Sequence, residues 1–228
     1  MQNLLLLHGA LGSEATLFPL KEQLQPYFHT YTLGFSGHGG KAIPAAPFGM
    51  DMFAQDILNL LDEQQLESTY LFGYSMGGYA ALCFARQHPD RVKGIFTLAT
   101  KFDWSPETAA KETRLLNPAK IQEKVPQFAQ TLASRHAPQN WKEVMQKTAE
   151  MMHHLGAQPP LSAETLAEVT VPVQVGVGDR DNMVSVEETT WAYRQLPQAR
   201  LLVLPNTPHP LEKVATEKLS QEIRQFCS

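Results

Sequence analysis

The residue best suited to nucleophilic chemistry in this chain is Ser75, which stands in the middle of the run Gly73–Gly77. The apolar stretch Tyr70–Phe72 precedes this run and an alanine-rich segment follows it, so we expect Ser75 at a sharp turn from a strand into a helix. The glycines at the two ends of the run leave room for a strained serine backbone. Such a turn exposes the hydroxyl, and the pattern therefore predicts a nucleophile for attack on a carbonyl group.

A serine hydroxyl is a poor nucleophile at neutral pH, so it requires a nearby base and a carboxylate that orients the base. Both residue types follow later apolar runs of the chain. Asp179 and Asp181 come directly after the run Val173–Val177, and His209 comes after the last such run. Taken alone, each of these residues would be interpreted as an ordinary loop residue. Their joint position predicts that a carboxylate and an imidazole meet the serine at one edge of a sheet.

Six short apolar runs predict the strands that would position these groups. Their hydrophobicity is continuous rather than alternating, which is typical of a parallel sheet covered by helices on both faces. Helical segments fit between the runs as crossover connections, so we expect an α/β fold. The predicted strands are Leu4–Leu7, Thr30–Phe35, Thr69–Phe72, Gly94–Ala99, Val173–Val177 and Leu201–Leu204.

The predicted helices alternate with these strands over most of the chain. Asp51 is expected to act as the N-cap of one helix. The helices cover about Glu14–Leu24, Asp51–Gln64, Met76–Gln87, Val186–Leu196 and a closing segment after Pro210.

One long stretch between two predicted strands breaks this alternation. Residues 101–169 are far longer than an ordinary crossover, and prolines divide them into segments with helical patterning, such as Asn140–Leu155. We therefore expect an inserted helical cap made of several short helices. Residues 1–100 and 170–228 would then form the core domain.

The order of Ser75, Asp181 and His209 and the motifs around them resemble the α/β-hydrolase superfamily over nearly the whole chain. The family pattern places the acid three residues after a glycine and three before an aliphatic residue, which favours Asp181 over Asp179. Asp179 is then a solvated turn residue. The resemblance implies a catalytic triad in which His209 is the base.

The run His8–Gly12 is similar to the family's loop after the first central strand. The resemblance makes the backbone N–H groups of Ala10 and Met76 the expected oxyanion hole. The chain begins directly at this first strand, without the N-terminal hairpin that many relatives carry. We therefore expect a mostly parallel six-stranded sheet with helices on both faces.

Two positions depart from the family pattern. The family's Gly-His-Gly turn after the second central strand is present around His38, but Gly34 and Ser36 stand where an aspartate and a proline usually precede it. The glycine that commonly precedes the catalytic histidine is Pro208, and Pro210 follows. Because both proline rings stiffen the loop, we expect a rigid presentation of the imidazole.

Composition sets limits on partners and location. The chain has 228 residues, 43% hydrophobic and 18% charged, with a net charge of −4, so we expect no nucleic-acid partner. Its two cysteines form no disulfide framework or metal spacing, and no apolar run is long enough for membrane insertion. A cytoplasmic protein is expected. The adjacent pair His153–His154 lacks further ligands at metal spacing, so no metal or cofactor is expected.

Other residues admit a functional and a structural interpretation. His8 and His38 are interpreted as structural hydrogen-bonding residues in turns. We expect Leu11, Tyr74, Trp104 and Trp141 to bind substrate. Large apolar residues of the insertion could line an acyl pocket over Ser75, but for any one of them a place in the small core of the cap is at least as well supported. These residues are Trp104, Phe128, Trp141, Met145, Met151 and Met152.

The resemblance implies a serine hydrolase that cleaves a small or medium acyl substrate, most simply a carboxylic ester, through an acyl-enzyme on Ser75. One alternative is a menaquinone-pathway-like lyase or C–C hydrolase with the same triad, although Tyr79 stands where the lyase branch tends to place an arginine. A second alternative is a non-catalytic ligand-binding protein on a hydrolase fold. Hydrolysis of p-nitrophenyl esters that requires Ser75 distinguishes the first interpretation from the last.

Overall fold

The centre of the molecule is one six-stranded sheet, seen in a computed structural model that describes residues 1–228. Neighbouring strands are all parallel, in the order β2-β1-β3-β4-β5-β6, which confirms the predicted α/β fold. The strands are β1 Gln2–Leu7, β2 Phe28–Leu33, β3 Thr69–Tyr74, β4 Val92–Leu98, β5 Val173–Gly178 and β6 Ala199–Leu204.

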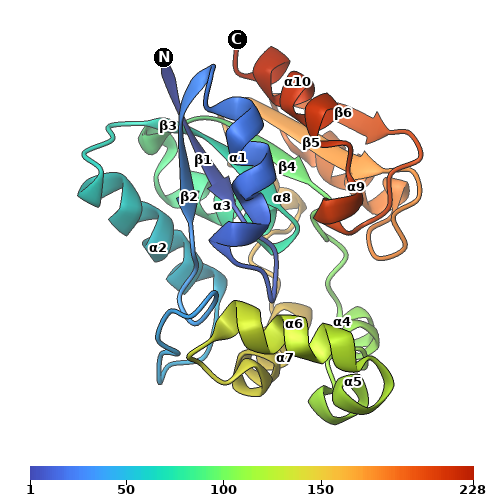
Figure 1. Ribbon diagram of the computed structural model, residues 1–228. Coiled ribbons are helices and arrows are strands. Elements are labelled where there is room, and N and C mark those ends of the chain that lie inside the picture. Colours follow the sequence, from blue (N-terminus) through green and yellow to red (C-terminus); the bar gives the residue numbers. More distant parts are fainter.

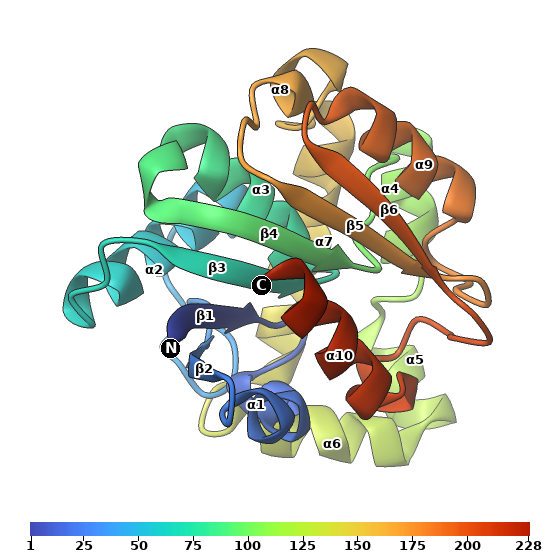
Figure 2. The same cartoon turned by 90° about the horizontal axis from the view of Figure 1, so that it is seen from above.

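Helices cover both faces of this sheet (Figures 1 and 2). α1 (Phe18–Leu24) and α10 (Thr216–Phe226) pack together on one face. The other face carries α2 (Met50–Glu63), α3 (Met76–Gln87) and α9 (Val186–Gln195). The sheet is therefore the middle of three layers. Its exposed residues lie on the edge strands or near strand starts, namely His29 on β2, Arg200 and Val203 on β6, Gln2 on β1 and Lys93 on β4.

The first strand illustrates why the apolar runs are continuous. Leu4 and Leu6 belong to the hydrophobic cluster under α1 and α10, whereas Leu5 and Leu7 belong to the cluster under α2 and α3. All four side chains are fully buried. Successive residues of a strand point to opposite faces, so two covered faces require apolar residues at every position.

Two helix starts differ from the sequence-based expectation. The predicted helix Glu14–Leu24 is a 3-10 turn over Glu14–Leu17 followed by α1. The prediction of Asp51 as an N-cap was wrong, because Gly49 occupies that position and Asp51 lies in the first turn of α2. The Asp51 carboxylate instead accepts a hydrogen bond from Gln87 Nε2 at 3.1 Å. An acidic side chain still suits this position, because it faces the positive end of the helix dipole.

The stretch between β4 and β5 contains five helices. Proline is the first residue of three of them, where its missing N–H costs no intrahelical hydrogen bond. Three of the prolines that divide the predicted segments, Pro106, Pro118 and Pro126, are thus helix starts, whereas Pro138, Pro159 and Pro160 lie between helices. The helices are α4 Pro106–Thr113, α5 Pro118–Lys124, α6 Pro126–His136, α7 Trp141–Ala157 and α8 Ala163–Ala167.

These five helices do not stay together. α4, α5, α6 and α7 form a layer beyond the carboxyl ends of the strands (Figure 1), where α4 packs on α7 and α5 on α6. α8 lies beside α9 on the core side (Figure 2). The carboxyl edge of the sheet, where the predicted site residues lie, is therefore covered by the layer of α4–α7.

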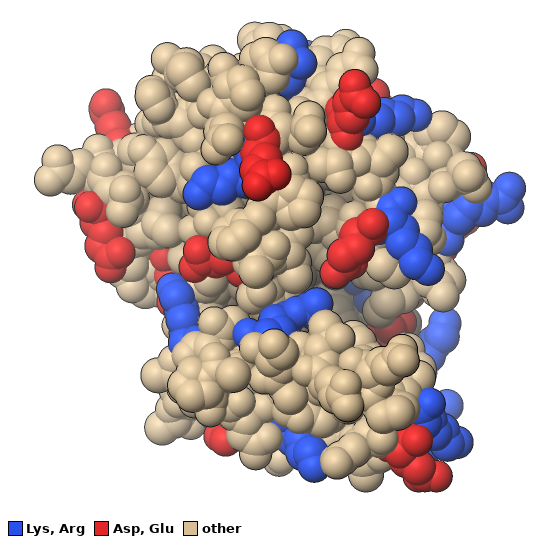
Figure 3. Space-filling model, viewed as in Figure 1, with Lys and Arg blue, Asp and Glu red and all other residues tan.

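The surface carries charges of both signs. Figure 3 shows Lys and Arg side chains interspersed with Asp and Glu side chains on the face viewed, and a furrow between the layer of α4–α7 and the body that contains the sheet. No helix combines the length and the apolar character that a bilayer crossing requires.

Candidate active site

Ser75 occupies the turn between β3 and α3. Its backbone has φ 51° and ψ −117°, in the left-handed half of conformational space that a non-glycine residue rarely adopts. The Ser75 N–H donates to the Leu98 carbonyl at 2.8 Å, and the Thr100 hydroxyl donates to the Ser75 carbonyl at 3.0 Å. The strained turn is therefore fixed from both sides by the neighbouring strand β4 and its loop.

A glycine of the predicted run lets the turn approach β1 closely. A Cβ atom added at Gly77 would lie 2.6 Å from the Leu7 carbonyl oxygen, closer than packed carbon and oxygen atoms allow. A side chain at position 77 would therefore push the turn away from β1, which explains why this position is a glycine.

Asp181 and His209 come together from two different loops. Asp181 follows β5 and His209 follows β6, and His209 Nδ1 lies 2.8 Å from Asp181 Oδ2. The other carboxylate oxygen of Asp181 accepts backbone N–H groups of Met183 and Val184, both at 2.8 Å. The Asp181 side chain is fully buried. Burial alone would raise the pKa of its carboxyl, but the hydrogen bonds from His209, Val184 and Met183 outweigh burial and lower it.

Asp179 has a different partner. Its carboxylate accepts the Thr207 N–H at 3.2 Å and so joins the loop after β5 to the loop after β6. The carbonyl of His209 accepts a hydrogen bond from the Tyr74 hydroxyl at 3.0 Å. These contacts, together with the two flanking prolines, hold the imidazole loop against the end of β3.

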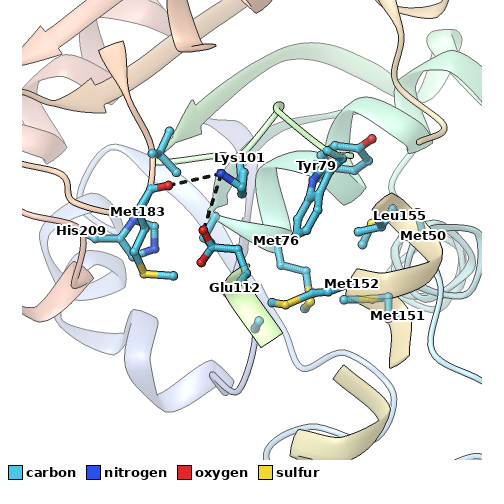
Figure 4. Close-up of a pocket in the computed structure, with 14 residues that line it drawn as sticks. Met50, Met76, Tyr79, Lys101, Glu112, Met151, Met152, Leu155, Met183 and His209 are labelled. Atoms are coloured by element: carbon cyan, nitrogen blue, oxygen red, sulfur yellow. Dashed lines mark hydrogen bonds and ion pairs between the residues drawn. The ribbon is translucent and has the colours of Figure 1, made fainter. Parts of the chain in front are cut away.

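Ser75 and His209 share the wall of one cavity, drawn in Figure 4. The Asp181 bond occupies Nδ1 of His209, and Nε2 makes no hydrogen bond within the protein, to Ser75 or to any other residue. Hydrogen bonds between nucleophile and base are often long without substrate. The nitrogen that would act as the base is thus free on the cavity side.

Ala10 and Met76 line the same cavity. The Ala10 N–H donates no hydrogen bond within the protein. Met76 is the first residue of α3, so its N–H has no partner inside the helix. The adjacent Leu11 has φ 56°, and its carbonyl accepts from Arg135 Nη1 at 2.9 Å. Two N–H donors and a fixed loop therefore lie beside Ser75.

The residues expected to bind substrate divide into two groups. Trp104 lines the cavity, as do Met151 and Met152. Leu11, Tyr74 and Trp141 lie outside its lining. Tyr74 supports the His209 loop, the Leu11 carbonyl is bound to α6, and Trp141 is buried in the large hydrophobic cluster that also contains residues of α2 and α3. The same cluster holds Met145, whereas Phe128 is largely exposed.

Several lining residues were not selected from the sequence. Lys101 could have been found, since it follows the end of a predicted strand at the carboxyl edge of the sheet. Glu112 gave no such signal, because an acidic residue in a helix normally faces solvent. The cavity wall further includes Met50, Tyr79, Leu155, Met183 and Val184.

Three other histidines form a buried group next to the site. The rings of His8 and His38 lie 5.5 Å apart, and those of His38 and His136 lie 5.9 Å apart. His8 Nε2 accepts the Phe35 N–H at 3.2 Å, so Nδ1 carries the proton and donates to the Gly9 carbonyl. Burial is the main reason that the pKa falls to about 3 for His8 and to about 4 for His38 and His136. These imidazoles are neutral and bind backbone groups.

His136 links the insertion to the loop after β1. Its Nδ1 accepts the Gly39 N–H at 3.1 Å, so its Nε2–H donates to the Leu11 carbonyl at 3.2 Å. By contrast, His153 and His154 take part in no group of three His, Cys, Asp or Glu side chains that could hold a metal ion, and the structure contains no such group.

Comparisons with known proteins show the family and the fold of this chain. A family model described as "alpha/beta hydrolase fold" matches residues 2–140. The chain is 22% identical, over 98% of its length and 87% of the relative's, to a 2-(acetamidomethylene)succinate hydrolase from Mesorhizobium japonicum. It is 23% identical, over 98% of its length and 76% of the relative's, to Lipase 3 from a Moraxella species.

A similar fold is present in solved structures. A thermophilic esterase from Thermogutta terrifontis superposes with a TM-score of 0.79 at 24% identity, over 100% of this chain and 89% of that chain. At this identity the likeness shows the fold alone. The homologues by sequence include esterases, lipases and other hydrolases.

Proposed function

Because the chain belongs to the alpha/beta hydrolase fold family, we propose that it is a serine hydrolase that cleaves a small or medium carboxylic ester through an acyl-enzyme on Ser75. This is a carboxylesterase-type reaction and needs no metal or cofactor. The observation that carries the proposal is the 2.8 Å contact between His209 Nδ1 and Asp181, with the free Nε2 in the wall that also contains Ser75.

The first half of the reaction forms the acyl-enzyme. His209 Nε2 removes the hydroxyl proton of Ser75, and the Ser75 oxygen attacks the ester carbonyl. Asp181 keeps the proton of the imidazole on Nδ1 before attack and stabilises the imidazolium that forms. The leaving alcohol then takes the proton from Nε2 as the C–O bond breaks.

The negative charge that develops on the carbonyl oxygen requires donors. The N–H groups of Ala10 and Met76 supply them, since neither has a partner that would have to be given up. Preorganised donors are worth about 10²–10³ in turnover each. In the second half, His209 activates a water molecule that attacks the acyl-enzyme, and the carboxylic acid is released.

The cavity supports an acyl substrate. Ten of its fourteen lining residues are hydrophobic. Such a lining suits the burial of an alkyl chain and disfavours a strongly hydrated polar group. The insertion over residues 101–169 acts as a cap in this proposal, because α4 and α7 contribute Glu112, Met151 and Met152 to the wall.

The lyase alternative has less support. Tyr79, at the position where that branch tends to place an arginine, accepts a hydrogen bond from the Leu161 N–H at 3.2 Å and supplies no positive charge. A C–C hydrolase would use the same three residues, and a protein that only binds its ligand would have them without turnover.

A panel of p-nitrophenyl esters of increasing acyl length tests the proposal. We expect release of p-nitrophenol by the wild-type protein and none above background in Ser75→Ala, with unchanged circular dichroism. Equal rates for both proteins would refute a role of Ser75. Binding of the esters to both proteins without release of p-nitrophenol would favour the alternative of a non-catalytic ligand-binding protein.

A further inference from the structure

The cavity next to Ser75 has two chemically different sides. In Figure 4, Met50, Met151, Met152 and Leu155 lie on one side, whereas Lys101 and Glu112 lie on the other, near His209. The methionine side offers only apolar contacts. The other side places an ammonium group and a carboxylate in the wall of an otherwise apolar cavity, where charged side chains are costly unless they have a function or full partners.

Lys101 is held from the core side. Its Nζ lies 3.7 Å from Glu112 Oε1 and 3.7 Å from Glu188 Oε2, and 3.5 Å from the Met183 carbonyl oxygen. Glu188 has its own donors, because its carboxylate accepts N–H groups of Phe102, Asp103 and Ser185. The position of Lys101 is therefore set by the Glu188 carboxylate, which backbone N–H groups hold in place.

Glu112 is not satisfied in the same way. Only 7% of the residue is exposed, it lines the cavity, and its carboxylate makes no hydrogen bond; its one charged neighbour is Lys101 at 3.7 Å. The carboxylate oxygens are not among the fully buried polar atoms that lack a partner, so they keep an open side. An acceptor is thus available in the wall of the cavity.

Trp104 lines the same cavity and carries an unpaired donor. Its indole Nε1 is buried and has no hydrogen-bond partner, although the residue lines the cavity. The indole N–H donates only, whereas the Glu112 carboxylate accepts only. A group that satisfies both must accept one hydrogen bond and donate another.

The charge balance favours a neutral group over an anion, and a carboxamide is a neutral group of this kind. Lys101, Glu112 and Glu188 together carry one positive and two negative charges, so a substrate carboxylate would meet net repulsion. A carboxamide has a carbonyl oxygen for Trp104 or Lys101 and an N–H for Glu112, and it carries no charge. We propose that the Lys101–Glu112–Trp104 wall selects acyl substrates whose chain carries a carboxamide, and rejects those that carry a carboxylate. This inference rests on the proposed ester hydrolysis.

Three methyl esters of matched length test the selection. The first ends in a carboxamide, the second in a carboxylate and the third in an ethyl group. The set is prepared at the chain lengths of succinate, glutarate and adipate, so that the assay also identifies the chain length that the cavity accepts best. We expect the wild-type kcat/KM for the carboxamide to exceed that for the carboxylate by about tenfold or more at the best length. A higher kcat/KM for the carboxylate at every length would overturn the proposal.

Substitutions in the wall assign the selection to its residues. Glu112→Leu should lower the ratio of kcat/KM between the carboxamide and the ethyl ester by about tenfold, since a hydrogen bond to a charged group is lost. Glu112→Gln should raise the relative kcat/KM of the carboxylate ester, and Trp104→Phe should lower the carboxamide ratio severalfold. Glu107→Leu, which changes the same charge at an exposed position of α4, is the matched control and should leave all ratios unchanged.

Binding to the Ser75→Ala protein separates this proposal from the proposed reaction. Isothermal titration should show tighter binding of the carboxamide ester than of the carboxylate ester, and Glu112→Leu in that background should remove the difference. If no ester is hydrolysed by the wild-type protein but this preference is present, the reaction is wrong and the selection stands. Equal binding of both esters, or the same ratios in Glu112→Leu and Glu107→Leu, would refute the selection.

Discussion

One imidazole, His209, and a group of three others lie near the carboxyl ends of the strands, and their surroundings differ in one decisive respect. His209 contacts the carboxylate of Asp181 and keeps Nε2 free in the wall of a cavity. His8, His38 and His136 face one another and backbone groups, with no carboxylate partner, and their pKa values fall to about 3 or 4. A carboxylate and access to a cavity suit an imidazole for proton transfer, whereas burial among neutral groups makes it a structural element.

The largest effect expected from this comparison concerns the carboxylate of Asp181. Asp181→Asn should lower kcat for ester hydrolysis by about 10³–10⁴-fold, because the amide no longer stabilises the imidazolium or selects its tautomer. The side chain keeps an oxygen for the N–H groups of Met183 and Val184, so the loop should persist. Initial rates with a p-nitrophenyl ester, together with thermal unfolding of the variant, measure both effects.

Asp179→Asn is the matched control for that variant. Asp179 binds the Thr207 N–H rather than His209, and an asparagine oxygen can accept the same hydrogen bond. We expect kcat within a few fold of wild type. A loss comparable to that of Asp181→Asn would mean that the two aspartates have been assigned the wrong roles.

The next effect is a pH dependence of stability that originates in the buried group. In the unfolded chain these three histidines take up protons near pH 6.5, whereas in the folded protein they stay neutral down to about pH 4, or about 3 for His8. The unfolded state therefore binds more protons below pH 6.5, and the free energy of unfolding falls as the pH is lowered. Well below pH 6.5 each histidine contributes at most about 1.4 kcal/mol per pH unit, and the three together about 4 kcal/mol per pH unit.

Urea unfolding at several values between pH 7 and pH 5 measures this slope. The range stays above the values at which carboxylates titrate, so the histidines dominate the change. A free energy of unfolding that is constant over the range would contradict neutral, buried imidazoles.

The smallest effect is expected at the centre of the buried group. His38 Nε2 is buried without a partner, and the ring lies 5.3 Å from the Phe48 ring and 5.8 Å from the Phe53 ring. His38→Phe removes an unsatisfied nitrogen but also the contact with the Ser36 carbonyl, so stability at pH 7 should change by only about 1 kcal/mol. The pH slope should fall by about a third, and esterase activity should stay near wild type.

Esterase assays and unfolding of the same preparation of His38→Phe check this prediction. A loss of activity as large as that of Asp181→Asn, in a protein that remains folded, would remove the distinction between His209 and the group of three histidines.

Local features of the chain were predictable from the sequence because local physics decides them. The apolar runs gave all six strands, and the glycines around Ser75 gave the strained turn, since these patterns leave few alternatives for the backbone. Asp51 shows the limit of such reasoning. A good capping residue is the second residue of the helix, because α2 begins at Met50 with Gly49 as its N-cap.

Contacts across long stretches of sequence could not be predicted in the same way. Nothing in the sequence around Trp141 distinguishes a side chain that packs in the hydrophobic core from one that faces the cavity, since both are apolar. The same holds for His136, whose position next to His38 depends on how α6 crosses the loop after β2. Glu112 reaches the cavity only because α4 lies over Lys101.

The rate at which a fluorophosphonate probe labels the folded protein tests the central claim most directly, with the modified residue located by mass spectrometry of its peptides. The account predicts a single adduct at Ser75, none in Ser75→Ala, and labelling slowed by about 10³-fold in Asp181→Asn. An adduct at another residue, or equal labelling rates for the wild-type and Asp181→Asn proteins, would contradict it.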